Sequence, residues 1–127
     1  MTTILVVEDK LNQRLLYQME LEDDGYRVVL ASDGWEALEQ VKEEHPDLVV
    51  LDLLMPGMGG IEALDRMMDQ NAKLPVIIYS AYESFRNNLA WAADAYVVKS
   101  SNLDVLMHEI ERVLLERQVK NNEPAAR

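Results

Sequence analysis

The feature that most constrains this chain is its alternation of short apolar runs with longer amphipathic segments. The apolar runs, rich in Val, Ile and Leu, lie at 4–8, 26–31, 47–52, 75–80 and 95–99. Four of the five are almost continuously apolar, as expected of strands whose two faces are both covered by helices. Strands that alternate with helices form βαβ units around a parallel sheet. The pattern therefore predicts an α/β fold with a five-stranded parallel sheet.

Helical periodicity occupies the segments between these runs. The expected helices cover 11–24, the stretch from Asp33 to Pro46, a segment that begins near Gly60, 83–92 and 102–117. Asp33 and Glu36 form a capping-box signal, and Gly25 suits the end of the first helix. The apolar face expected for that first helix consists of Leu11, Leu15, Leu16 and Met19.

Size and charge limit the organisation and the partners. A chain of 127 residues fits one domain, which we expect to span 1–117, with 118–127 as a polar tail or the start of a linker. The net charge of −11 argues against direct contact with nucleic acid or an anionic membrane, because both attract positive charge. With no cysteine, no long apolar run and no signal-peptide pattern, we expect a cytoplasmic protein without a membrane span.

Polar side chains end four of the predicted strands. Glu8 and Asp9 end the first, Asp52 the third, Ser80 the fourth and Lys99 the fifth. The carboxyl ends of parallel strands lie along one edge of the sheet, where open α/β proteins bind their ligands. We therefore expect these four segments to deliver their polar groups to one place.

The charges of this cluster indicate its chemistry. Carboxylates within a few ångströms repel each other by about 4 kcal/mol per close pair at an effective dielectric constant near 20. Lys99 offers one compensating charge, and an all-oxygen site suits Mg²⁺ or Mn²⁺. Such a site can also neutralise a phosphoryl group while a carboxylate oxygen attacks phosphorus. Asp52 is the candidate nucleophile, because it is central and a Pro/Gly-rich loop follows it.

Together these residues resemble a known family. The acidic pair in "VVED", the segment "LDLLMPGMGG", Ser80 followed by Ala81, and "DAYVVK" are similar to the receiver domain of two-component response regulators, over residues 3–117. The resemblance implies a flavodoxin-like, doubly wound single domain with strand order 2-1-3-4-5 and five helices. By the same resemblance, Glu8 and Asp9 hold Mg²⁺, Asp52 is the phosphoacceptor, and the backbone carbonyl of Leu54 completes the metal site.

The resemblance also implies a switch. Ser80 matches the hydroxyl that bonds the phosphoryl group, Lys99 the lysine of the family, and Tyr96 the aromatic residue that turns inward on activation. The output face would comprise the helix at 83–92, the fifth strand and the last helix, and it could also support a homodimer. The chain departs from the family at Ser100, where a proline usually follows the lysine, which leaves the geometry after Lys99 open.

The predicted function is a signalling switch that accepts a phosphoryl group from a sensor histidine kinase or a phosphotransfer protein and acts on a downstream output domain or protein. It catalyses only its own phosphorylation and slow dephosphorylation. One alternative is a receiver-like protein-binding module that works without phosphorylation. A haloacid-dehalogenase-type phosphohydrolase would need an acid at Leu54, and the FMN phosphate of a flavodoxin-like electron carrier would be repelled by Glu8 and Asp9. The cognate kinase, the output, the oligomeric state and the presence of further domains are left open.

Overall fold

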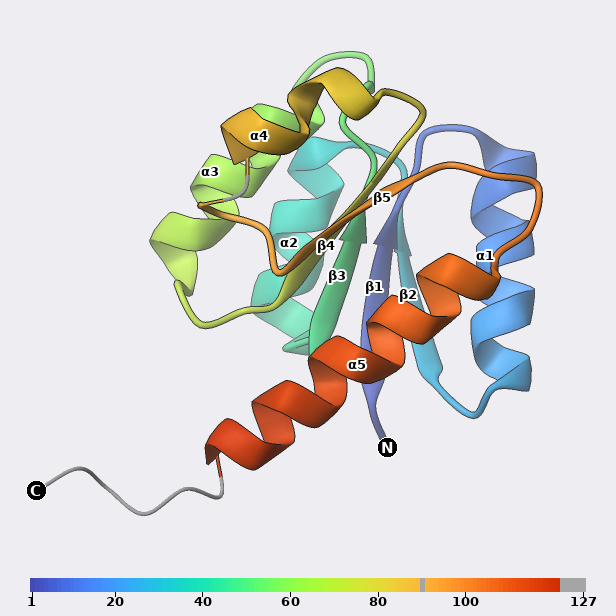
Figure 1. Ribbon diagram of the computed structural model, residues 1–127. Helices are drawn as coiled ribbons and strands as arrows, with labels where there is room; N and C mark the ends of the chain where they lie inside the picture. Colours follow the sequence, from blue (N-terminus) through green and yellow to red (C-terminus); the bar gives the residue numbers. More distant parts are fainter. Residues whose placement is uncertain (90, 122–127) are drawn as a thin grey trace, which may run out of the picture.

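A central parallel sheet organises the protein. The computed structural model describes residues 1–89 and 91–121, and its strands follow the order β2-β1-β3-β4-β5. The strands are β1 (Thr3–Val7), β2 (Arg27–Ala31), β3 (Leu48–Leu51), β4 (Val76–Ser80) and β5 (Ala95–Val98). All neighbouring pairs are parallel, so the carboxyl ends of all five strands lie at one edge, at the arrowheads in Figure 1. This confirms the predicted doubly wound, flavodoxin-like α/β fold.

Helices cover both faces of the sheet. They are α1 (Leu11–Asp23), α2 (Gly34–Glu44), α3 (Gly60–Gln70), α4 (Arg86–Leu89) and α5 (Asp104–Asn121), with a 3₁₀ turn, η1 (Glu83–Phe85), before α4. In Figure 1 α5 lies in front of the sheet and α2 and α3 lie behind it. The end signals behave as predicted: the Asp33 side chain accepts the Glu36 N–H at 2.8 Å, and Gly25, with φ of 94°, follows the end of α1.

The core consists of two apolar layers separated by the sheet. One layer joins β1 side chains such as Leu5 and Val7 to buried residues of α2 and α3. The other joins Ile4 and Val6 to buried residues of α1 and α5. Successive strand residues point to opposite faces, so a strand between two layers must be apolar throughout. This is why the central strands appear in the sequence as uninterrupted apolar runs.

The predicted apolar face of α1 was wrong. Leu11, Leu15, Leu16 and Met19 are between 43% and 63% exposed, whereas Tyr17 and Leu21 are buried against the sheet. This helix has two sets of residues at helical spacing that could face the sheet. The more apolar set, Leu11, Leu15, Leu16 and Met19, faces outward. The physical reason lies at the site, because the sheet-facing stripe also carries the polar residues that reach the acidic cluster.

Two helix boundaries also differ from expectation. The helix predicted at 83–92 is a 3₁₀ turn followed by the single-turn α4, which ends at Leu89; residue 90 of that range lies outside the described residues. The last helix continues past Arg117 to Asn121, so residues 118–121 are helical, and 122–127 lie outside the described part. Gln118, Val119 and Lys120 are compatible with a helix, and polarity alone did not mark its end. The domain division at 117 stays a prediction.

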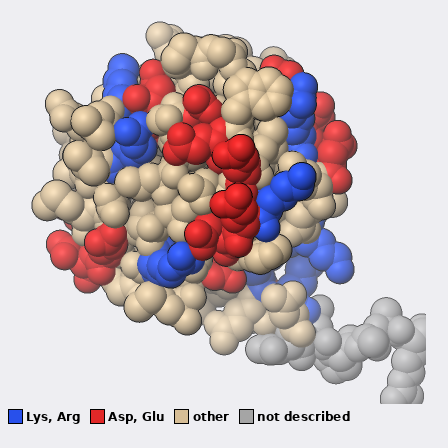
Figure 2. All heavy atoms as spheres, turned by 180° about the vertical axis from the view of Figure 1, so that it is seen from behind, with Lys and Arg blue, Asp and Glu red and all other residues tan. Residues whose placement is uncertain are grey.

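Acidic side chains gather on the face of the sheet covered by α2 and α3. Figure 2 shows this side, with acidic groups extending down its middle and basic groups between and beside them. The acidic groups in the middle of this face would repel a phosphate backbone. Within the described residues, no helix is long and apolar enough to cross a membrane.

The loop between Asp52 and α3 turns back closely on the strand. The Gly60 N–H donates to the Leu53 carbonyl at 2.9 Å. A Cβ atom on Gly60 would lie 2.2 Å from the Asp52 carbonyl oxygen and 2.5 Å from the Leu53 Cα. Only glycine therefore allows α3 to begin so close to the end of β3.

We expect Gly60→Ala to lower the free energy of unfolding by about 2 kcal/mol, because the atoms that a methyl group would meet belong to the backbone and cannot rotate away. Urea denaturation monitored by circular dichroism would measure this. Gly59→Ala is the matched control, since the nearest atom to its Cβ would be 3.8 Å away, and it should cost under about 1 kcal/mol. Equal losses in the two variants would contradict the steric explanation.

Candidate functional site

The predicted site residues lie at the carboxyl edge of the sheet. Glu8, Asp52 and Lys99 each follow directly after the last residue of a strand, and Ser80 is the last residue of β4. The Lys99 N–H donates to the Ser80 carbonyl at 2.7 Å, which joins the ends of β4 and β5. At these positions a side chain leaves the apolar layers and faces the crevice above the strands. The charged groups of Glu8, Asp52 and Lys99 therefore lie outside the apolar core, although each residue directly follows a strand of the sheet.

Three carboxylates form the centre of the site. One oxygen from each of Glu8, Asp9 and Asp52 lies within 4.8 Å of the others. Glu8 is 1% exposed and Asp52 is 7% exposed, so neither charge is well solvated by water. Charges at this distance repel strongly once water is excluded. The cluster requires cations to compensate it.

Lys99 supplies one such cation. Its Nζ donates to Glu8 Oε1 at 2.6 Å and to Asp52 Oδ2 at 3.3 Å, so one ammonium bridges two carboxylates from different strands. Burial by itself lowers the pKa of Lys99, but the hydrogen bond to Glu8 and the charges of Asp52 and Glu8 outweigh it, and the pKa is raised. Lys99 therefore remains charged at neutral pH.

The Asp9 carboxylate has one oxygen without a hydrogen-bond partner among the described residues. Its Oδ1 atom is buried and has no hydrogen-bond partner in the described part of the chain. Burial raises the pKa of Asp9, and the neighbouring Glu8 carboxylate raises it further. An unpartnered carboxylate oxygen beside two more carboxylates is a donor set that hard divalent cations prefer. The residues present thus fit Mg²⁺.

Two residues of α1 that were not predicted from the sequence also reach the site. The Arg14 Nη1 atom donates to the Glu8 carbonyl at 2.8 Å and approaches the Asp9 carbonyl at 3.5 Å. The Gln13 Oε1 atom accepts from Lys99 Nζ at 3.1 Å. Gln13 lies one helical turn before Tyr17, on the side of α1 that faces the sheet. The spacing of Gln13 and Tyr17 could have indicated that Gln13 faces the sheet. The apolar stripe that includes Leu11 and Leu15 was the stronger pattern in the sequence.

Ser80 is buried and close to this centre, but its hydroxyl bonds to the backbone two residues further along the chain. Its side chain is 0% exposed, and its Oγ accepts the Tyr82 N–H at 3.2 Å. Within the described residues the hydroxyl makes no hydrogen bond to the carboxylates. Ser80 is connected to the cluster through its backbone carbonyl, which holds Lys99.

Tyr96 lies on β5, apart from the carboxylates. Its hydroxyl donates to the Tyr82 carbonyl in the loop that follows Ser80. The Arg86 guanidinium lies 5.0 Å from the centre of the Tyr96 ring and donates to the Tyr96 carbonyl at 2.9 Å. Arg86 is in turn held by both carboxylate oxygens of Glu83. Tyr96 thus connects β5 to the loop between β4 and α4.

The structure also places Leu54 and Ser100. The Leu54 N–H donates to Asp52 Oδ1 at 3.4 Å, and its side chain is 50% exposed. Among the described residues every peptide bond is trans, including the one between Lys99 and Ser100. With serine at position 100, Lys99 reaches both Glu8 and Asp52.

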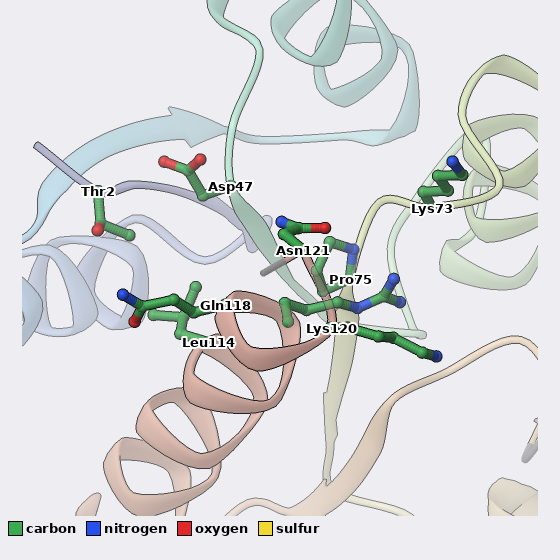
Figure 3. Close-up of a pocket in the computed structure, with 9 residues that line it drawn as sticks. Thr2, Asp47, Lys73, Pro75, Leu114, Gln118, Lys120 and Asn121 are labelled. Carbon is green, nitrogen blue, oxygen red and sulfur yellow. The ribbon is translucent and has the colours of Figure 1, made fainter. Parts of the chain in front are cut away.

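A groove of about 320 Å³ leads away from Lys99 between α1 and the loop before α5, and it includes Leu16 and Ser100. A separate hollow of about 860 Å³ lies at the amino ends of the strands, where Figure 3 shows Asp47 and Pro75 opposite side chains of α5. Its residues are at the far end of the sheet from the carboxylates. The larger of these two hollows is therefore not the one beside the carboxylates.

Fold and site together define a class: a flavodoxin-like α/β protein with an acidic centre, bridged by one lysine, at the carboxyl edge of its sheet. A model of the response regulator receiver domain matches residues 4–111. The chain therefore belongs to the response regulator receiver domain family, the regulatory domains of two-component signalling. This sets aside the phosphohydrolase and electron-carrier alternatives.

Individual relatives agree. Response regulator ArlR of Staphylococcus saprophyticus is 36% identical over 125 residues, which cover 96% of this chain and 56% of the relative. This chain thus spans about half the length of the curated relatives that it matches. The structure of TrrA from Thermotoga maritima with Mg²⁺-BeF is 39% identical and has a TM-score of 0.85 over 89% of this chain and 99% of its own. TrrA in complex with the histidine kinase ThkA has a TM-score of 0.83, over 90% of this chain and 99% of TrrA, at the same identity.

Lys99→Met should lower the free energy of unfolding by about 3 kcal/mol at pH 7 without divalent cations, because it leaves buried carboxylates uncompensated. The pKa of Lys99 is raised in the folded protein, so its stabilising contribution is fully present below the ordinary lysine pKa and is lost as pH rises through the raised value. The difference from wild type should therefore be constant from pH 7 to about 10 and narrow above that.

Urea titrations in EDTA at several pH values measure this difference. Lys73→Met, at an exposed position, is the control and should cost less than about 0.5 kcal/mol. If both variants lose the same stability, the bridge between Glu8 and Asp52 does not stabilise the fold.

Proposed function

We propose that this domain is a phosphorylation-activated switch in which Asp52 accepts a phosphoryl group from a histidine of a sensor kinase or a phosphotransfer protein. The observation that carries this proposal is the bridge from Lys99 Nζ to Asp52 and Glu8 at the buried carboxyl edge. The Asp52 carboxylate, one cation and two further carboxylates lie close together there. A centre built only for stability would gain little from so many like charges.

The transfer step follows from this arrangement. An Asp52 carboxylate oxygen attacks phosphorus, the bond between phosphorus and the kinase histidine breaks, and the imidazole leaves with the bonding electron pair. Lys99 can neutralise oxygens of the transferred group. The Ser80 hydroxyl accepts the Tyr82 N–H and donates to no group in the described part of the chain, so its proton is available to those oxygens. Hydrolysis of the acyl phosphate by water resets the switch.

A divalent cation belongs to this proposal. The Glu8, Asp9 and Asp52 carboxylates would hold Mg²⁺, or Mn²⁺, with the backbone carbonyl of Leu54 as a further ligand. When bound, the cation supplies charge neutralisation for the phosphoryl oxygens. This chain's own part is to present an oxygen-rich site, to which Asp9 contributes its unpartnered buried oxygen.

The proposed readout passes through β5. Phosphorylation adds about −1.5 to −2 charge units and several acceptor oxygens. If the Ser80 side chain rotates to donate to these oxygens, its Oγ moves relative to the Tyr82 N–H that it accepts. The carbonyl of Tyr82 is the partner of the Tyr96 hydroxyl. A change at Ser80 is thereby coupled to Tyr96 and Arg86, and so to the face formed by α4, β5 and α5. An output domain, an output protein or a second copy of the domain would bind there.

The exposed apolar stripe of α1 is the surface we assign to the kinase. Leu11, Leu15, Leu16 and Met19 leave an apolar helix face in water, and Leu16 also lines the groove that reaches Lys99. A partner seated on this stripe would have direct access to the carboxyl edge. The relative TrrA forms a complex with a histidine kinase, which supports a kinase as the occupant.

Intact-mass spectrometry after incubation with acetyl phosphate tests the chemistry. We expect a Mg²⁺-dependent phosphoryl adduct on the wild type and none on Asp52→Asn, because the amide is not a nucleophile. Absence of an adduct on folded wild-type protein would instead favour a binding module that works without phosphorylation. An adduct retained in Asp52→Asn would show that another residue is the acceptor.

Kinase docking is tested with the sensor kinase from the same genome that phosphorylates the wild type fastest. Leu16→Ser should slow that transfer at least about tenfold, because it removes an apolar contact at the centre of the stripe. Its phosphorylation by acetyl phosphate, which needs no docking, should stay close to the wild-type rate. Leu115→Ser, at an exposed leucine of α5, is the control. Equal slowing by both variants would exclude the α1 stripe as the kinase surface.

A further inference from the structure

The backbone on either side of Lys99 is fixed by two different residues of β4. On the preceding side, the Lys99 N–H donates to the Ser80 carbonyl at 2.7 Å. On the following side, the Tyr79 hydroxyl donates to the Ser100 carbonyl at 3.3 Å and accepts the Ser100 N–H at 3.5 Å. One hydroxyl therefore contacts both polar groups of the residue that comes directly after the lysine.

Tyr79 is well placed to be a rigid anchor. It is 2% exposed and lies in a central strand, so its ring cannot leave its position without disturbing the core. The Tyr17 ring packs against it edge to face, with ring centres 5.5 Å apart and an angle of 72°. Tyr79 also lines the narrow crevice that includes Glu8, Asp52 and Lys99. The hydroxyl thus presents a fixed point to an exposed loop.

The charged end of the lysine is held by the same group of side chains. The Gln13 Oε1 atom accepts from Lys99 Nζ at 3.1 Å and from the Tyr17 hydroxyl at 3.4 Å. Tyr17 in turn packs on Tyr79. The lysine has a flexible four-carbon stem and many alternative positions. Here both its backbone and its ammonium are connected to one buried tyrosine pair.

The identity of residue 100 matters to this arrangement. A proline at this position has no N–H and could not donate to the Tyr79 hydroxyl. Ser100 is exposed and its backbone N–H is available. The hydrogen bond from the residue 100 N–H to the Tyr79 hydroxyl is thus possible because serine, not proline, follows the lysine.

We propose that Tyr79 is a positioning residue for the phosphorylation reaction, whose buried hydroxyl holds the Ser100 peptide so that the Lys99 ammonium stays within reach of Asp52. The proposal rests on the function proposed above for Asp52. It assigns to Tyr79 no contact with the phosphoryl group. Its effect passes entirely through Lys99.

The test compares two variants that each lose one tyrosine hydroxyl. Tyr79→Phe keeps the ring and removes both contacts with Ser100. Tyr26→Phe is the matched control, because Tyr26 packs against the same apolar layer and its hydroxyl makes no hydrogen bond in the described part of the chain. With acetyl phosphate and saturating Mg²⁺, Tyr79→Phe should be phosphorylated about three- to tenfold more slowly, the effect of losing one or two hydrogen bonds. Mg²⁺ affinity should be unchanged in both variants.

A double-mutant cycle separates positioning from a general structural effect. In a Lys99→Met background, which is slow by itself, adding Tyr79→Phe should cause no further loss, since the residue through which it acts is gone. The same fold-loss with and without Lys99, or equal slowing by Tyr26→Phe, would overturn the proposal. So would a Tyr79→Phe rate equal to that of the wild type.

A second measurement does not depend on phosphorylation. The ¹⁵N order parameter of the Ser100 amide should fall in Tyr79→Phe and stay unchanged in Tyr26→Phe. If the wild type forms no adduct, the function proposed for Asp52 fails; an unchanged order parameter would then show separately that Tyr79 does not hold the loop. If the wild type is phosphorylated and neither the rate nor the order parameter changes, only the role of Tyr79 is excluded.

Discussion

The repulsion among three carboxylates at the carboxyl edge of the sheet, and the need to compensate it, is the constraint on which the rest of this structure depends. Glu8, Asp9 and Asp52 bring three carboxylates together where little water reaches them. One lysine, delivered by a strand at the far side of the sheet, offsets part of that charge through contacts with Glu8 and Asp52. The remaining excess of negative charge, on three sets of carboxylate oxygens, fits a divalent cation. Strand order, burial and chemistry are therefore linked, because only a parallel sheet with β1 beside β3 collects these residues at one edge.

The same demand explains the orientation of α1. This helix must turn a polar stripe toward the sheet, since Arg14 holds the backbone of the acidic pair and Gln13 holds the lysine ammonium. Its stronger apolar stripe is consequently left in water beside the groove that reaches Lys99. An exposed apolar helix face of this kind usually marks an interaction surface. In this protein one orientation of α1 both brings polar side chains to the site and leaves the apolar stripe exposed.

β5 and the lysine that directly follows it have two roles. Lys99 connects it to the carboxylates, and Tyr96 connects it to the loop after Ser80. Tyr79 and Ser80 are neighbours on β4, so their side chains point to opposite sides of the sheet. Tyr79 reaches the peptide after the lysine, while the carbonyl of Ser80 holds the lysine N–H. A change in charge at Asp52 therefore acts directly on Lys99, the residue whose backbone these contacts hold.

The sequence by itself determined the strands, their parallel arrangement and the polar residues at their ends, because these follow from local patterns: apolar runs, helical spacing and the position of a charge after a run. It also identified the acidic pair, Asp52, Ser80 and Lys99 as candidates for one site. The tertiary structure decided what depends on distant partners. Which stripe of α1 faces inward was settled by the acidic cluster, and the role of Tyr79 appears only when residues 21 apart in the chain meet at Ser100. Local patterns report on burial, whereas the pairing of polar groups depends on which strands and helices become neighbours.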